Sequence, residues 1–247
     1  DGFTPNPDIL CNQKIKFNLF LKKALNEINA DFLATGHYCQ NILSNDNTYQ
    51  LSKATDLNKD QTYFLYTVNQ SILSKVLFPL GHLTKPQVRQ IALDNNIPTH
   101  NKKDSTGICF IGKRDFTPFL QKFLGYKEGI IKTIDGEIIG HHCGYAYYTI
   151  GQRKGLGIGG KGDAWFVADK DIKNNIVIVA QGQNHPSLFT DTLIATDLSW
   201  VSAPPRSFPF SCHSKVRYRQ PDQECVITKI EDNKAYVSFA KPQRAVT

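Results

Sequence analysis

The sequence predicts an α/β domain followed by a small β-rich domain and a C-terminal β-barrel. Three observations lead to this prediction. Apolar residues recur at helical spacing in the first half of the chain. A short apolar run between the helical segments there is typical of a buried parallel strand. After Gly125 the spacing changes to strand-like alternation, and no long helical pattern returns. We expect three domains, over 1–124, 125–183 and 184–247.

The first domain is expected to open with an amphipathic helix over 14–28, because its apolar positions follow helical spacing and lysines occupy the other face. The run 30–37 then predicts a buried parallel strand that delivers Gly36 and His37 at its carboxyl end. Open α/β sheets bind their ligands at such ends. A plain strand-to-loop turn explains the same residues, so both interpretations stay open.

Four more segments are expected before Gly125. In the segment 58–66, Lys59 could neutralise a phosphate and Gln61 could hydrogen-bond one, although a solvated turn explains both residues equally well. The segments are a hairpin over 43–51, a loop entering a helix over 58–66, a helix that begins at the Thr84 capping box and ends by Pro98, and a short amphipathic helix over 116–123.

The second half is expected to consist of strands and turns. Asp135-Gly136 between two alternating runs predicts a hairpin with a two-residue type I′ turn. Gly155-x-Gly157-x-x-Gly160 formally matches a dinucleotide-binding fingerprint, but a strand is predicted after it where the fingerprint needs a helix. A phosphate-contacting loop and a simple turn cluster are the two interpretations left. The expected strands are 130–134, 137–139, 145–150, 165–168, 176–180, 193–200, 210–218, 225–230 and 235–239.

Composition and charge limit the class of protein. The 247 residues are 40% hydrophobic and 21% charged, as in an ordinary globular protein. No apolar run approaches the ~20 residues that span a bilayer, and no signal-peptide pattern opens the chain. The net charge of +7 and the pI near 9.0 favour an anionic partner, nucleic acid first, with a generally basic surface as the alternative. Because the chain begins at Asp1 and contains no Met, we expect a piece of a longer protein.

Six widely spaced cysteines, with no Cys-x-x-Cys pair, argue against a structural zinc site. An even count could be a secreted disulfide set, but the length of the chain and the absence of a signal-peptide pattern favour a reducing cytosol. Two have unusual surroundings. Cys11 follows Pro5-Asn6-Pro7-Asp8, a stiff path that we expect to present Asp8 and Cys11 at the mouth of a helix beginning near Asn12, where the macrodipole favours a thiolate. Cys109 lies among Ser, Thr and Gly. We hypothesise that these two thiols meet and carry out sulfur chemistry; the alternative is that both are structural.

Several long motifs occur in one order over essentially the whole chain. They are Pro5-Asn6-Pro7-Asp8-x-x-Cys11-Asn12, Ala34-Thr35-Gly36-His37-Tyr38, Asp56-x-Asn58-Lys59-Asp60-Gln61, Asp104-Ser105-Thr106-Gly107-Ile108-Cys109-Phe110-Ile111-Gly112, Gly151-Gln152-Arg153-Lys154-Gly155-Leu156-Gly157 and Arg217-Tyr218-Arg219-Gln220. Together they resemble the tRNA-specific 2-thiouridylase (MnmA) family. The resemblance implies that the first domain is an incomplete ATP-pyrophosphatase domain of the adenine-nucleotide alpha-hydrolase-like type. The family's Ser-Gly-Gly-x-Asp-Ser loop would lie upstream of Asp1 and its closing barrel strands beyond Thr247, so we expect a fragment that lacks both.

The resemblance implies ATP-dependent replacement of the 2-oxygen of the wobble uridine by sulfur. The substrates would be tRNAs for glutamate, glutamine and lysine. Adenylation would turn a poor leaving group into a good one, and sulfur would then expel AMP. Cys109 matches the cysteine that carries the persulfide, and Cys11 the thiol that attacks the persulfide or the activated base, which would leave a transient Cys11–Cys109 disulfide. Asp8 matches the general acid/base.

The same resemblance assigns contact residues. Asn6, Pro7 and Asp8 would line the extruded uridine, and Gly36 would contact ATP. The residues that match tRNA contacts are His37, Lys59, Asp60, Gln61, Arg217 and Tyr218, with Arg153 and Lys154 as further candidates. Most such contacts should be to phosphate and sugar.

We further expect ATP with Mg²⁺ but no structural metal, and a sulfur-relay protein or a cysteine desulfurase as sulfur donor. We also expect a monomer without membrane contact in the bacterial cytoplasm, with an organellar homologue as the alternative. The fragment itself should be inactive without the ATP loop. Two rival functions are a non-catalytic RNA-binding module with inert cysteines and another ATP-pyrophosphatase, such as a 4-thiouridine or argininosuccinate-type synthetase. The combination of thiol loop and β-barrel disfavours the second rival.

Overall fold

The computed structural model describes residues 6–103 and 116–247. They form two compact units. The α/β unit comprises 6–103 with the short segment 198–206, and the β unit comprises 116–197 with 207–247. Cys109, with the rest of its motif, and Pro5 lie outside the described residues. The predicted boundaries near residues 124 and 183 stay predictions.

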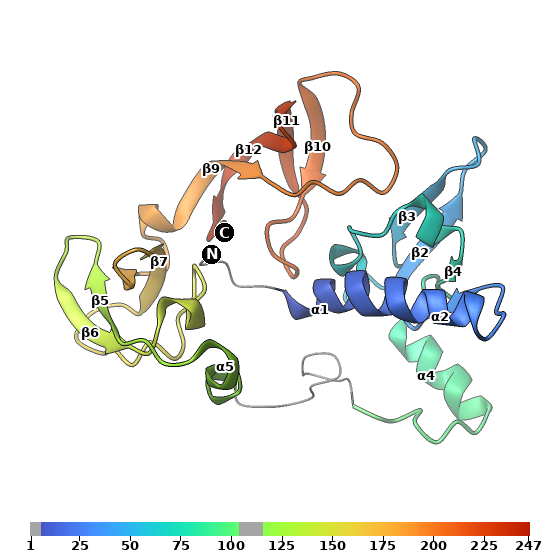
Figure 1. The fold of residues 1–247 in the computed structure, drawn as a ribbon, viewed down its shortest axis with the longest axis horizontal. Coiled ribbons are helices and arrows are strands. Elements are labelled where there is room, and N and C mark those ends of the chain that lie inside the picture. Colours follow the sequence, from blue (N-terminus) through green and yellow to red (C-terminus); the bar gives the residue numbers. More distant parts are fainter. Residues whose placement is uncertain (1–5, 104–115) are drawn as a thin grey trace. The chain divides into compact units, whose positions relative to one another are not determined.

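The α/β unit opens with one continuous helical segment, formed by α1 (Pro7–Leu10), the π-helical η1 (Cys11–Phe20) and α2 (Leu21–Asn26) (Figure 1). The prediction that this helix begins near Asn12 is wrong. The Asn6 side chain accepts hydrogen bonds from the backbone N–H groups of Asp8 (3.1 Å) and Ile9 (3.4 Å), so Asn6 is the N-cap and a proline follows in the first turn. This arrangement is a common helix start.

Two small sheets follow this helix. Strand β1 (Leu33–Ala34) pairs in parallel with β4 (Val76–Leu77), which confirms the predicted parallel strand. Strands β2 (Cys39–Leu43) and β3 (Tyr49–Lys53) form the predicted hairpin. The remaining elements of the unit are η2 (Thr62–Phe64), α3 (Gln70–Leu73) and α4 (Lys85–Asp94). The expected capping box is present at the start of α4, where the Gln87 Oε1 accepts hydrogen bonds from the Thr84 N–H (2.8 Å) and the Thr84 hydroxyl (2.9 Å).

One apolar core joins the helix to these sheets. Gln70 also donates a hydrogen bond to the Val201 carbonyl (3.0 Å), which ties the segment 198–206 to the unit. Burial of such a core is the main stabilising term of a domain of this size. Its buried members are Phe17, Leu21, Leu33, Cys39, Leu65, Val68, Leu73, Val76 and Phe78.

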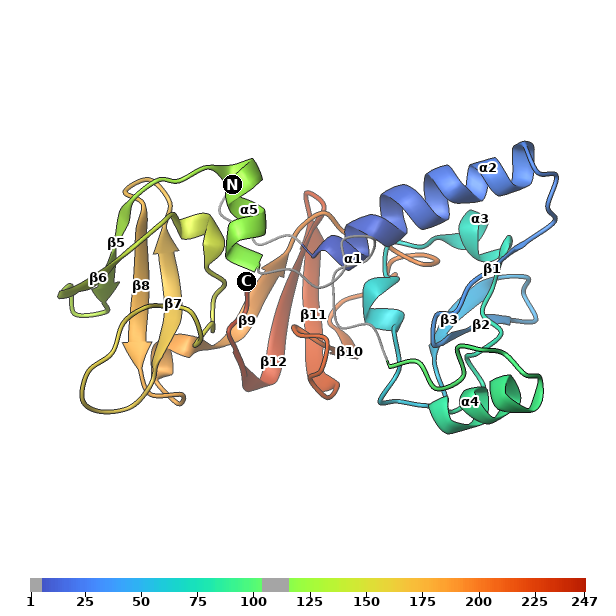
Figure 2. The ribbon, with the colours of Figure 1, turned by 90° about the horizontal axis from the view of Figure 1, so that it is seen from below.

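The β unit contains two four-stranded sheets and the helix α5 (Phe116–Leu124). The first sheet has the order β6-β5-β8-β7, with β5 and β8 parallel, and Figure 2 shows β7 and β8 side by side. The second has the order β10-β11-β12-β9, and all its pairs are antiparallel. The strands are β5 (Gly129–Thr133), β6 (Ile138–His142), β7 (Trp165–Asp171), β8 (Ile176–Gln181), β9 (Phe189–Ala195), β10 (Phe210–Ser214), β11 (Gln223–Glu231) and β12 (Lys234–Arg244).

Two details of the β unit differ from prediction. The hairpin turn after Thr133 is not a two-residue type I′ turn: Gly136 alone has positive φ (+93°), and the Thr133 N–H donates to the Glu137 carbonyl across three intervening residues. The strand predicted over 145–150 is instead a short 3-10 helix, η3 (Tyr145–Tyr147). A strand after the glycine loop is confirmed as β7, which removes the dinucleotide-fingerprint interpretation.

Candidate functional site

The carboxyl end of β1 opens into a pocket of about 640 Å³ in the α/β unit. Gly36, His37 and Gln61 line it together, so the fold gathers three of the predicted site residues. A Cβ atom on Gly36 would meet only Leu80, at an ordinary 3.9 Å, so the glycine borders open space. Lys16 from η1 is the cation of the lining. No sequence motif identifies Lys16, because only the packing of the helix brings it to the strand end.

His37 is a buried ring of this site. Its side chain is 7% exposed and contacts the rings of Phe17 and Phe78, with centroid distances of 5.6 and 6.2 Å. Its Nδ1 shares a hydrogen bond with the Thr35 hydroxyl at 2.9 Å. Burial, and then the charge of Lys16, lower the pKa of His37 to about 4. The imidazole is therefore neutral at pH 7, and its predicted contact with tRNA stays a prediction.

The loop that carries the Lys59-Asp60-Gln61 motif is held by its own polar side chains. The buried Asp60 carboxylate accepts hydrogen bonds from the Ala54 N–H (2.8 Å), the Thr62 N–H (3.3 Å) and the Thr62 hydroxyl (2.6 Å). Gln61 exchanges two hydrogen bonds with the backbone of Tyr38, at 3.0 and 2.9 Å. In the described structure, Asp60 and Gln61 thus shape the loop and join it to the strand end.

The opening motif lies on the first helical turns. Asp8 is half-buried in the first turn, and Cys11, at 6% exposure, lies one turn further along. Because the Cys11 N–H already donates to the carbonyls of Asp8 and Pro7, this thiol is inside the helix and not at its mouth. The macrodipole argument for a stabilised thiolate therefore does not apply, since the effect is confined to the first turn. The proposed Cys11–Cys109 pair lies outside what the structure describes.

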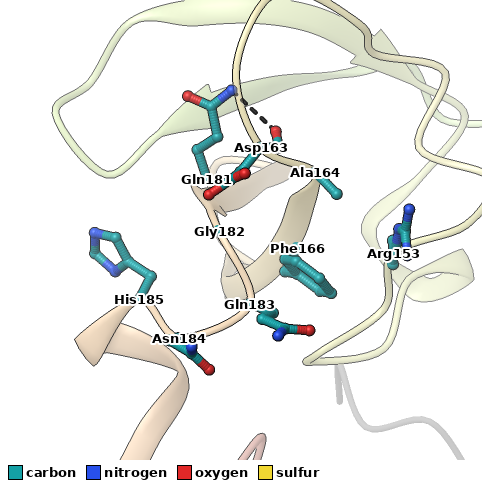
Figure 3. A pocket seen from close by; sticks show the side chains of 9 residues that line it. All are labelled: Arg153, Asp163, Ala164, Phe166, Gln181, Gly182, Gln183, Asn184 and His185. Atoms are coloured by element: carbon teal, nitrogen blue, oxygen red, sulfur yellow. Dashed lines mark hydrogen bonds between the residues drawn. The ribbon is translucent and has the colours of Figure 1, made fainter.

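The candidate RNA-binding residues of the β unit lie beside two further pockets. Arg217 donates from Nη2 to the carbonyls of Ile150 (3.0 Å) and Ala245 (2.6 Å), next to a pocket of about 570 Å³. Arg153 lines another pocket, of about 510 Å³. Figure 3 shows the Phe166 ring in the middle of that pocket, with Arg153 on one side and His185 on the other. Lys154 and Arg153 are exposed, and Tyr218 is half-buried.

Residues 6–103 and 116–247 contain no group of three or more His, Cys, Asp and Glu side chains that could hold a metal ion. Their helices are all too short or too polar to cross a membrane.

Three family models match the chain in order. They are described as the tRNA methyl transferase HUP domain (residues 1–113), the tRNA methyl transferase PRC-barrel domain (117–181) and the aminomethyltransferase beta-barrel domain (190–247). With the fold, these matches define a HUP-domain protein that carries two β-rich domains. The predicted fold class, an α/β domain followed by β-rich domains, is thereby confirmed.

The chain belongs to the tRNA-specific 2-thiouridylase (MnmA) family. It is 61% identical to the tRNA-specific 2-thiouridylase MnmA of Protochlamydia amoebophila over 246 residues, which cover 100% of this chain and 65% of that protein. It is 53% identical to the enzyme of the same name from Shouchella clausii (246 residues, 100% and 67%). A third relative of that name, from Alkaliphilus oremlandii, is also 53% identical (248 residues, 100% and 68%). The chain thus spans about two thirds of the length of these relatives.

Proposed function

We propose that this chain is the larger part of an enzyme that replaces the 2-oxygen of the tRNA wobble uridine by sulfur. The observation that carries the proposal is the match to proteins named tRNA-specific 2-thiouridylase along the entire chain, at 61% identity to one of them. The predicted tRNAs are those for glutamate, glutamine and lysine. A sulfur-relay protein or a cysteine desulfurase would supply the sulfur. We expect the enzyme to act as a monomer in the bacterial cytoplasm.

The pocket at the end of β1 suits a nucleotide. Its volume of about 640 Å³ lies within the range of small-molecule sites, and its lining combines apolar side chains with the cation of Lys16 and the exposed backbone of Gly36. In this proposal ATP, bound with Mg²⁺, would supply the adenylyl group that makes the uridine 2-oxygen a leaving group. The apolar wall that includes Phe20 would hold the base, and Lys16 would stabilise negative charge.

The opening motif supplies the groups for the chemistry. Asn6, Pro7 and Asp8 border the extruded uridine, and Asp8 moves the proton that the reaction requires. Cys109 carries the persulfide sulfur, and Cys11 attacks it or the activated base. When sulfur is transferred, the Cys11–Cys109 disulfide forms, and a reductant of the thiol class must return both residues to thiols before the next turnover.

The proposal is tested in a chimera in which this chain replaces the matching part of the Protochlamydia amoebophila relative. Mass spectrometry of the tRNA nucleosides measures 2-thiouridine. Cys11→Ser and Cys109→Ser should each abolish its formation, while Cys143→Ser, a half-buried cysteine of the β unit, should retain it. Full activity of either of the first two variants would overturn the catalytic assignment. The chain alone is expected to bind tRNA without thiolating it.

A further inference from the structure

The pocket of about 570 Å³ in the β unit holds two arginines and no acidic side chain. It is lined by the turn that contains Gly151 and Gln152, by Arg217, and by Arg244 at the end of β12. The family resemblance accounts for Arg217 alone. Arg217 and Arg244 are 27 positions apart in the sequence, and no motif spacing links them.

Both guanidinium groups are held in place. Arg217 is bonded through Nη2 to the carbonyls of Ile150 and Ala245. Arg244 donates from Nε to the Gln183 carbonyl (3.2 Å), and its Cζ lies 4.8 Å from the centroid of the Phe166 ring. A guanidinium that is stacked and hydrogen-bonded loses little conformational freedom when it binds a ligand.

One donor of Arg244 has no acceptor. Its Nη2 atom is buried, and within the described residues nothing accepts its hydrogen bonds. Buried polar atoms are nearly always hydrogen-bonded, so this donor needs an acceptor that the described residues do not supply. A phosphate group does so, because its oxygens match the planar fork of a guanidinium.

Gly151 explains how the turn comes so close to these side chains. It has φ of +81°, and a Cβ atom there would lie 2.5 Å from the Ala245 Cβ and 3.6 Å from the Arg244 Nη1. Only a glycine permits this conformation without strain, and only a glycine leaves this space next to Ala245. The start of the glycine-rich motif therefore has a structural role in the β unit, because it forms one wall of the pocket that Arg217 and Arg244 line.

We propose that Arg244, together with Arg217, binds one phosphodiester group of the tRNA backbone. The proposal rests on the proposed function, because it takes tRNA as the partner. The net charge of +7 and the absence of acidic side chains from the pocket lining favour a polyanion as the occupant. Arg244 is a binding residue that neither the motifs nor the resemblance identified.

The test measures tRNA binding by the 247-residue chain as a function of salt. Arg244→Gln keeps a polar side chain of similar length and removes the charge, so the slope of log K against log salt should fall by about 0.9 and the affinity by roughly tenfold. The matched control is Lys241→Gln, which removes an exposed charge from the same strand outside the pocket and should leave both values near those of the wild type.

Two further measurements separate binding from folding. Arg244→Lys keeps the charge but loses the planar fork, so it should keep the salt slope and lose affinity. In a tRNA with single neutral methylphosphonate linkages, one position should weaken binding by the wild type and have no effect on Arg244→Gln. A wild-type slope and affinity in Arg244→Gln, or an equal loss in Lys241→Gln, would overturn the proposal. If the wild-type chain bound no tRNA at any salt concentration, the proposed function would fail instead.

Discussion

His37 should stay uncharged in the folded α/β unit down to about pH 5. Its ring lies between Phe17 and Phe78, and Lys16 is close enough to oppose a second positive charge. Burial first, and this charge second, lower its pKa to about 4, against an ordinary value of 6.5. A solvent-exposed histidine that contacted RNA phosphate would have the opposite tendency, because a neighbouring anion raises the pKa of an imidazole.

The consequence is a pH-dependent stability of defined sign. The unfolded chain takes up a proton on His37 as the pH falls through 6.5, whereas the folded chain does so only near pH 4. The contribution of the buried, neutral His37 to the free energy of unfolding is therefore fully present above pH 6.5 and is lost as the pH falls toward 4. Between pH 7 and pH 5 the two values give a loss of about 2 kcal/mol in the free energy of unfolding.

Urea unfolding at pH 7 and pH 5 measures this loss. Trp200 belongs to the segment that packs with the α/β unit, so its fluorescence in a Trp165→Phe background reports on that unit alone. His37→Phe should remove about 2 kcal/mol of the pH dependence, whereas His82→Phe, at an exposed position, should not change it. An imidazole resonance of His37 that titrates near pH 6.5, or equal pH dependence in both variants, would refute the argument.

Three more predictions concern single residues, one of them with a matched control variant. Asp60→Ala should destabilise the α/β unit by about 3 kcal/mol, because the buried Ala54 N–H and the half-buried N–H and hydroxyl of Thr62 lose their carboxylate acceptor. Urea unfolding measures this loss, and unchanged stability would refute the structural role of the carboxylate. Gly81→Ala should lower the free energy of unfolding by more than about 2 kcal/mol, because its Cβ would lie 1.9 Å from the Cys39 carbonyl oxygen. Gly159→Ala is the control and should leave the stability unchanged, because its Cβ would meet no atom within 4 Å. Thermal unfolding measures both variants. Asp8→Ala in the chimera should keep tRNA affinity and lose turnover; a large loss of affinity would make Asp8 a structural residue.

Local sequence patterns predict those parts of the α/β unit whose structure is set by neighbouring residues. The apolar run before Gly36 and its glycine were enough to predict a parallel strand, although the strand is only two residues long. The helix start was missed for a local reason as well. Two prolines near Asp8 indicate a stiff path, but Asn6 followed by Pro7 is also an N-cap with proline in the first turn, and this second signal decides the structure.

The error over 145–150 has a non-local cause. Alternating aromatic residues favour a strand, but the Tyr145 N–H donates to the side chain of Asn175, thirty positions later, and Gly144 has φ of +141°. Tyr147 and Tyr148 are buried in the core of the β unit, which a short 3-10 turn permits. Such contacts override a weak strand preference, and no window of sequence contains them.

The same distinction applies to the candidate site. Motif resemblance could name Asp60 and His37 but could not show that both are buried, because burial depends on Ala54 and Thr62 around one and on two phenylalanines around the other. Arg244, by contrast, belongs to none of the motifs, and only the fold brings it to a pocket that Arg217 also lines. A motif therefore contains two kinds of residue: some stabilise the loop, and others bind the ligand. Measuring stability and tRNA binding on the same variants is what separates the two kinds.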